Sequence, residues 1–149
     1  MNEPNITWDA AKGIATCTII DNQGRKFIGI AKCHPDDLDF NSELTGCTIA
    51  SYRSMIKYLK SVKRDIIQPE LNALKQLYYS MNRSKKFNPK SYENIMLQRQ
   101  IHLREEDLAT IEEELARIEQ ELTSYISKKD ITYKKWRELR VQRKPQDEV

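Results

Sequence analysis

An apolar stripe with a seven-residue repeat runs through the second half of the chain and limits what it can fold into. The stripe consists of Leu97, Ile101, Leu108, Ile111, Leu115, Ile118, Leu122, Tyr125, Trp136 and Leu139. This spacing is typical of a coiled-coil seam and predicts a long helix over residues 90–143. At ~1.5 Å per residue, about fifty residues make a rod of roughly 80 Å. One such chain cannot cover the rod by itself, so we expect burial against the first helix or a second copy.

Charge along this helix is arranged in blocks. Residues 105–121 contain eight acids and one arginine, whereas residues 128–144 contain eight bases and two acids. Antiparallel pairing of two copies would place acid beside base, and parallel pairing would place like beside like. Because the apolar seam is too long to bury within one copy, we predict at least a dimer. Residues 144–149 are predicted to form a disordered tail.

A broken helix is predicted over residues 41–83. Asn41 or Ser42 is a suitable N-cap, and apolar residues then recur at helical spacing. Pro69 either ends this helix or kinks it, because proline has no N–H to donate. The connection to the second helix is predicted at residues 84–89.

Two β-branched runs precede the helices. Gly13–Asp21 and Arg25–Cys33 are of strand length, and the residues between them have turn chemistry, which predicts a β-hairpin. Ile6–Trp8 is predicted as a third, edge strand.

A lone hairpin is marginal, so we expect Ile14, Ile19 and Phe27 to pack on the first helix. The predicted fold class is α+β, with a small antiparallel sheet in residues 1–40 packed on long helices that form an oligomeric bundle. We expect one domain over residues 1–149, as is usual for this length.

Composition and motifs narrow the functional classes. The sequence has no run of eighteen apolar residues, so no membrane span is predicted. The start of the chain also lacks signal-peptide features, and we therefore expect a cytoplasmic protein. The three cysteines have no C-x-x-C spacing and are interpreted as reduced. The sequence has no glycine-rich nucleotide motif and no hydrolase motif, so we predict neither catalysis nor a cofactor.

His34, Asp36, Asp37 and Asp39 are residue types that bind metals. No second histidine or cysteine follows at ligand spacing, so a solvated acidic turn before a helix is the favoured interpretation. We predict no metal site.

Residues 77–104 concentrate positive charge, aromatic rings and amides between the two helices. Residues 53–104 contain twelve Lys or Arg and three Asp or Glu, which favours an anionic partner. Aromatic rings beside cations and amides suit a ligand that has both a base and phosphates. The same residues also have a purely structural interpretation, in which one of Tyr78 and Tyr79 packs in the core and the polar residues cap the second helix.

The ligand-binding residues predicted in this stretch are Tyr78, Arg83, Lys86, Phe87, Asn88 and Ser91. An aromatic ring would stack on the base, while the two cations and the free N–H groups at the start of the second helix would bind a pyrophosphate. We expect a partner subunit to close the site.

Three segments carry a resemblance to a known family: AKCHPDDLDF, YRSMIKYLK and LNALKQLYYSMNRSKKFNPKSYENIMLQRQI. They resemble the phage Thoeris anti-defence proteins of the first described type, over roughly residues 13–137. The resemblance implies an N-terminal sheet followed by long helices, homo-oligomers from dimers to hexamers, and a sponge function in the host cytoplasm. Such a sponge sequesters glycocyclic ADP-ribose, an immune signal, without cleaving it.

The resemblance also implies ligand contacts. In that family an aromatic residue and an asparagine ten residues later contact the ligand, and Tyr78 and Asn88 match this spacing, with Tyr where Phe is expected. Some members hold cyclic trinucleotides at a separate site, for which Arg53 matches an arginine of the first helix. Neither a membrane nor a nucleic-acid polymer is an expected partner.

Two other interpretations stay open. A nucleic-acid-binding regulator would use the basic first helix to follow phosphates and the repeat to dimerise, although the acidic block at 105–121 opposes this. A purely structural coiled coil would account for the repeat and leave residues 77–104 unexplained.

Overall fold

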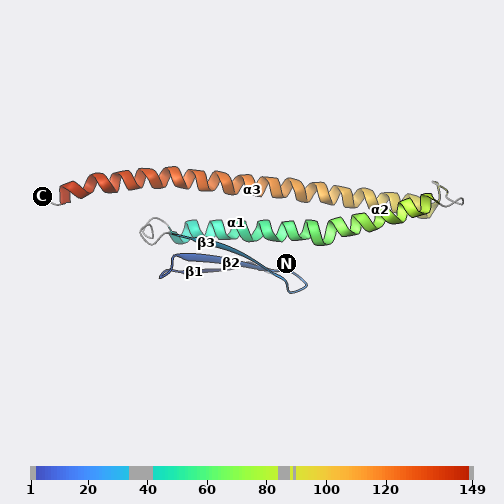
Figure 1. The fold of residues 1–149 in the computed structure, drawn as a ribbon, viewed down its shortest axis with the longest axis horizontal. Coiled ribbons are helices and arrows are strands. Elements are labelled where there is room, and N and C mark those ends of the chain that lie inside the picture. Colours follow the sequence, from blue (N-terminus) through green and yellow to red (C-terminus); the bar gives the residue numbers. More distant parts are fainter. Residues whose placement is uncertain (1–2, 34–41, 84–87, 89, 148–149) are drawn as a thin grey trace. The chain divides into compact units, whose positions relative to one another are not determined.

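The computed structural model describes residues 3–33, 42–83, 88 and 90–147 (Figure 1). Its elements are β1 (Asn5–Asp9), β2 (Ile14–Ile20), β3 (Lys26–Lys32), α1 (Ser42–Val62), the π-helical segment η2 (Lys63–Ile67), α2 (Gln68–Asn82) and α3 (Tyr92–Asp147). They form two compact units, which we call the sheet unit (residues 1–57 with 117–149) and the helical unit (residues 58–116). The predicted α+β class is confirmed.

The three strands form one antiparallel sheet in the order β1-β2-β3. β2 pairs with β3 along its whole length, from Ile14↔Lys32 to Ile20↔Lys26, and Ile6 of β1 pairs with Cys17 of β2. The predicted hairpin and the predicted edge strand are both confirmed.

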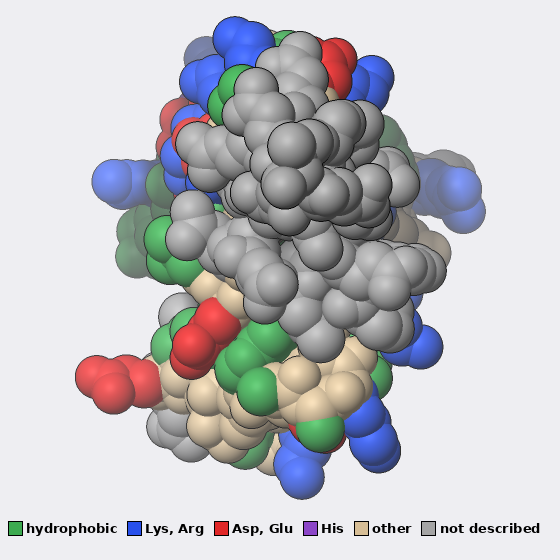
Figure 2. Space-filling view, turned by 90° about the vertical axis from the view of Figure 1, so that its left-hand side faces the viewer, with side chains coloured by type: hydrophobic (Ala, Val, Ile, Leu, Met, Phe, Trp, Pro, Cys, Tyr) green, Lys and Arg blue, Asp and Glu red, His purple; other side chains and the backbone are tan. Residues whose placement is uncertain are grey.

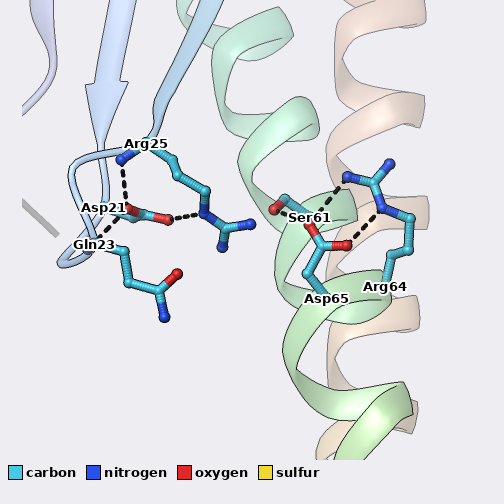
Figure 3. A network of polar contacts seen from close by, with 6 residues as sticks. All are labelled: Asp21, Gln23, Arg25, Ser61, Arg64 and Asp65. Atoms are coloured by element: carbon cyan, nitrogen blue, oxygen red, sulfur yellow. Dashed lines mark hydrogen bonds and ion pairs between the residues drawn. The ribbon is translucent and has the colours of Figure 1, made fainter.

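Asp21 closes the turn between β2 and β3 (Figure 3). Its Oδ1 accepts hydrogen bonds from the N–H groups of Gln23 and Arg25, and its Oδ2 accepts one from Arg25 Nε, each at 2.9 Å. Gly24 completes the turn with φ +80°, which costs a glycine nothing because it has no Cβ. Burial raises the pKa of the Asp21 carboxyl, but these hydrogen bonds outweigh it, so the pKa lies below the ordinary value of 3.8.

Small side chains bring the sheet close to α1. A buried cluster consists of Ala15, Cys17, Ala31 and Ala50. At Gly29 of β3, an added Cβ would lie 3.0 Å from Arg53 Cβ and would clash with the backbone of α1. The Ser54 hydroxyl donates to the Phe27 carbonyl at 2.7 Å, so a backbone acceptor of β3 is bonded directly to α1.

Side-chain alternation decides which strand residues reach α1. Ile19 shares the face of the buried cluster and is 1% exposed, as predicted. Phe27 is opposite Ile19 in the register and is half-buried, with the Arg25 guanidinium 5.8 Å from its ring centroid. Ile14 lies on the other face, so the prediction that it packs on the first helix is wrong.

The outer face of the sheet carries isoleucine and threonine. Ile28 and Ile30 are 39% and 45% exposed there. Figure 2 views the molecule from one end, and its lower half shows hydrophobic and polar surface side by side, with acidic side chains projecting at the left and Lys and Arg side chains at the bottom and right.

The first helix is broken just before Pro69, as predicted, and the break is a π-helical segment. The N–H of Gln68 donates to the Lys63 carbonyl, five residues earlier, as in a π-helix. Pro69 has no N–H to donate to Asp65, four residues earlier, so regular α-helical bonding cannot continue here. Ser61 Oγ donates to Asp65 at 2.9 Å, and Arg64 Nε donates to the same carboxylate at 2.8 Å (Figure 3).

Within the helical unit, α3 runs antiparallel to η2 and α2. Lys63 of η2 pairs with Glu112 at 3.2 Å, and Lys75 of α2 pairs with Glu105 at 3.5 Å. Leu97 and Leu115 of the seven-residue stripe are buried in this unit. The sequence allowed the stripe to pack either on the first helix or on a second copy. In the helical unit, the chain's own first helix packs on it.

The C-terminal part of α3 differs from the prediction. The helix continues to Asp147, so the tail predicted from residue 144 is wrong over 144–147. Pro145 has no N–H to donate, yet the backbone stays helical through it. Ile131 and Leu139 are 58% and 56% exposed. None of the helices in the described part of the chain combines the length and apolarity needed to cross a membrane.

Candidate ligand-binding site

Hydrogen bonds around Asn88 and Ser91 fix the start of α3. The Ser91 N–H donates to the Asn88 carbonyl at 3.0 Å, and the Ser91 hydroxyl accepts the N–H of Asn94 at 3.3 Å. Asn88 Oδ1 accepts the N–H of Lys90 at 3.0 Å. Ser91 is thus the N-cap of α3, and the oxygen of the Asn88 side chain stabilises the turn before it.

Asn94 lies inside this arrangement and is fully buried. Its Nδ2 donates to the Asn88 carbonyl at 3.4 Å. Its Oδ1 is buried as well and has no hydrogen-bond partner among the described residues. A buried acceptor without a donor is costly and uncommon in folded proteins. This oxygen is therefore a candidate for a hydrogen bond from a bound molecule.

Tyr78 reaches α3 from α2. Its hydroxyl accepts a hydrogen bond from Gln98 Nε2 at 3.5 Å, and its ring lies edge-on to that of Tyr79, with centroids 6.0 Å apart. Tyr78 is half-buried, whereas Tyr79 is 56% exposed. Gln98 follows Asn94 by one helical turn, so the two amides share a face of α3. The structure thus brings Tyr78 to the same face of α3 as Asn94. Asn88 and Ser91, at the start of α3, hold Asn94 in place.

The other predicted site residues are placed less completely. Arg83 is the C-cap of α2 and is exposed, at the end of the helix that carries Tyr78. Lys86 and Phe87 lie outside the described residues.

Arg53 belongs to the sheet unit, not to the unit that holds Tyr78. Its Nη1 donates to the Ile30 carbonyl at 2.6 Å, and Lys57 donates to the Ile28 carbonyl at 2.6 Å. These two cations bind backbone acceptors of β3, an edge strand whose carbonyls are otherwise open to pairing. Sequence reasoning did not anticipate this structural role.

Part of the positive charge counted in the sequence is paired inside the helical unit. Besides the pairs of Lys63 and Lys75, Arg104 contacts Glu70 at 3.6 Å and Asp107 at 3.1 Å. Residues 58–116 as a whole contain ten Lys or Arg and nine Asp or Glu. Residues 83–99, by contrast, contain five Lys or Arg and one Asp or Glu, so the excess positive charge of this unit belongs to the α2–α3 connection and the first turns of α3.

Comparison of the chain with protein-family models, with curated proteins and with solved structures gives no match. The candidate site therefore rests on its own chemistry and on the resemblance of the three segments named above.

A concave surface lies in the sheet unit, which holds neither Tyr78 nor Asn94. It is an open hollow of about 390 Å³ lined by Tyr52, Arg117, Gln120, Glu121, Ser124, Tyr125 and Lys128. The Tyr52 and Tyr125 rings are 6.3 Å apart, and Glu121 accepts hydrogen bonds from Arg117 at 2.6 Å and from the Tyr52 hydroxyl at 3.4 Å. Three of the polar side chains of this hollow, those of Tyr52, Arg117 and Glu121, thus bond to one another.

In the part of the chain that the structure describes, no three His, Cys, Asp or Glu side chains lie close enough together to bind one metal ion. The His34 cluster considered from the sequence lies outside the described residues.

Proposed function

We propose that this protein is a phage anti-defence sponge, which binds a cyclic ADP-ribose signal such as glycocyclic ADP-ribose and holds it without cleaving it. The observation that carries the proposal is the convergence of Tyr78, Gln98 and Asn94 on one face of α3, beside the turn formed by Asn88 and Ser91. An aromatic ring, a buried amide and a helix N-terminus are the groups that recognise a base, its polar edge and a phosphate.

The phosphates of such a ligand would lie at the start of α3. The first N–H groups of a helix have no intrahelical acceptor, and the helix dipole favours an anion there. Asn94 N–H already bonds to Ser91, so the N–H groups of Tyr92 and Glu93 are the candidates. Arg83 and Lys90 add positive charge nearby in sequence, and the Glu93 carboxylate opposes it.

The base would stack on Tyr78. The Gln98 contact holds the hydroxyl end of this side chain, which limits the rotamer entropy lost on binding. Asn88 Nδ2 would donate to the ligand, because the Oδ1 of the same amide is used by Lys90. A second copy would complete the enclosure, and the exposed apolar side chains of α3 at Ile131 and Leu139 support the proposed oligomer.

The alternative, a regulator that binds a nucleic-acid polymer, is less well supported. Such a protein needs a continuous basic surface. Residues 58–116 are close to electrically neutral, and Arg53 and Lys57 bond to the edge of β3. A small ligand needs only the local excess of positive charge at residues 83–99.

Titration calorimetry with glycocyclic ADP-ribose tests the proposal. We expect heat of binding and, after heat denaturation of the complex, recovery of the chemically intact ligand in mass spectrometry. An absence of binding would contradict the sponge function, and recovery of a cleaved ligand would contradict sequestration without cleavage.

A further inference from the structure

We propose that Asn94 Oδ1 accepts a hydrogen bond from a donor group of the bound nucleotide and so determines which nucleotides bind. This inference rests on the proposed function. The ligand chemistry that it requires is an N–H or O–H donor, either the exocyclic amine of the adenine or a free ribose hydroxyl.

The neighbours of Asn94 fix the orientation of its amide. A backbone carbonyl can only accept, so the end of the amide that contacts the Asn88 carbonyl must be the NH₂ group. Rotating the amide by half a turn would place two oxygens against each other. Oδ1 is therefore the opposite end of the amide, and it presents an acceptor.

The position of Asn94 places this acceptor beside Asn88 and Ser91, two residues of the candidate site. The main chain of Asn94 is held by Ser91 Oγ, and its side chain shares a helix face with Gln98, which contacts Tyr78 of α2. Ser91 thus holds the main chain of Asn94 and the Asn88 carbonyl holds its side chain, in a place that is 0% exposed. A side chain held in this way is suited to discriminating between ligands, because it cannot turn to solvent when the donor is missing.

Asn94 Oδ1 has no hydrogen-bond partner among the described residues, so it is available to accept a hydrogen bond from a ligand. A site built to bond a ligand donor rejects an analogue that lacks the donor, because the protein acceptor then stays buried and unpaired. Capping of α3 does not account for Oδ1, since Ser91 Oγ supplies the cap and Asn94 contributes only Nδ2 and its main-chain N–H.

The test compares ligands as well as variants. The parent protein, Asn94→Leu and Asn94→Ser are titrated with glycocyclic ADP-ribose and with analogues that lack, one at a time, the adenine amine or a free ribose hydroxyl. We expect the parent to bind the complete ligand at least tenfold more tightly than one of the analogues. The group that this weakly bound analogue lacks, amine or hydroxyl, is the donor. Each Asn94 variant should bind that analogue as tightly as it binds the complete ligand.

Asn72→Leu is a matched control, because Asn72 is an exposed asparagine in α2, and it should keep the discrimination of the parent. Thermal melts report whether each variant is folded, and Asn94→Ser covers the case in which leucine is not accommodated. Equal binding of all ligands by the parent overturns the inference without reference to any variant, as does full discrimination by a folded Asn94 variant. Failure of the parent to bind the complete ligand is a different result, which overturns the proposed function and this inference with it.

Discussion

Gly29 of β3 lies so close to Ser54 of α1 that a Cβ on the glycine would come within 2.5 Å of the Ser54 nitrogen. Both partners at this contact are main chain, and neither can move aside as the end of a flexible side chain could. The contact joins the two layers of the sheet unit.

Gly29→Ala is therefore expected to destabilise the protein by about 3 kcal/mol or more, because the sheet must separate from α1 to admit the methyl group. Urea unfolding measures this. Gly24→Ala is the control: nothing lies within 4 Å of its added Cβ, and only the strain of φ +80° remains, about 1 kcal/mol. Equal losses in the two variants would mean that β3 does not approach α1 this closely.

Tyr78→Ala is expected to weaken binding of glycocyclic ADP-ribose by roughly ten- to a hundredfold, since stacking on one base contributes about 1–3 kcal/mol. Calorimetry measures the change. Tyr79→Ala removes the neighbouring ring, which is 56% exposed, and should leave the affinity within about twofold. A larger effect at Tyr79 than at Tyr78 would move the stacking position to the exposed ring.

Asp21 should make stability depend on pH in the acid range. Its pKa is lower in the folded protein than the ordinary value of 3.8, so the folded state binds the proton less readily than the unfolded state does. The stabilisation is present above pH ~4 and is lost as the pH falls through the folded pKa. Thermal melts between pH 6 and pH 2.5 should show a smaller acid-induced loss for Asp21→Asn than for the parent. An identical pH profile in both proteins would rule out this contribution.

The oligomer prediction is tested by light scattering at micromolar concentration. We expect a mass of at least twice 17.6 kDa, because α3 carries exposed apolar residues in its C-terminal part. Leu139→Glu, at a position that is 56% exposed, should lower the oligomer mass without unfolding the chain. A parent protein that scatters as a single copy would show that α3 has no such partner under these conditions.

The elements that were predicted well have local causes. Turn residues at Asn22–Gly24 predict the hairpin, and the missing N–H of Pro69 predicts the break in the first helix. The face on which Ile14 lies was also available from alternation along the strand, but Ile14 was grouped with Ile19, although positions of odd separation lie on opposite faces.

The ion pairs between the helices could not be predicted from neighbouring positions in the sequence. Lys63 and Lys75 counted as part of a basic patch until the fold placed Glu112 and Glu105 beside them. Asn94 was not among the predicted ligand-binding residues, and its spacing of four from Gln98 was the available sign that both amides share a face of α3. The structural role of Arg53 depends on a strand more than twenty residues away, which no local pattern reports.

The π-helical segment also preserves the angular position of the candidate site. A π-helical turn holds one residue more than an α-helical turn, so the five residues of η2 turn the chain about as far as four residues of regular α-helix. Deleting Arg64 would allow regular helix up to Pro69 and would leave the side chains of α2 at nearly the same angle, with Tyr78 still beside Gln98. Deleting Ala73 instead, within the regular part of α2, would rotate Tyr78 by about 100°. We expect the Ala73 deletion to weaken ligand binding as much as Tyr78→Ala does, and the Arg64 deletion to leave it nearly unchanged. The extra residue of η2 is thus absorbed before the helix reaches the ring.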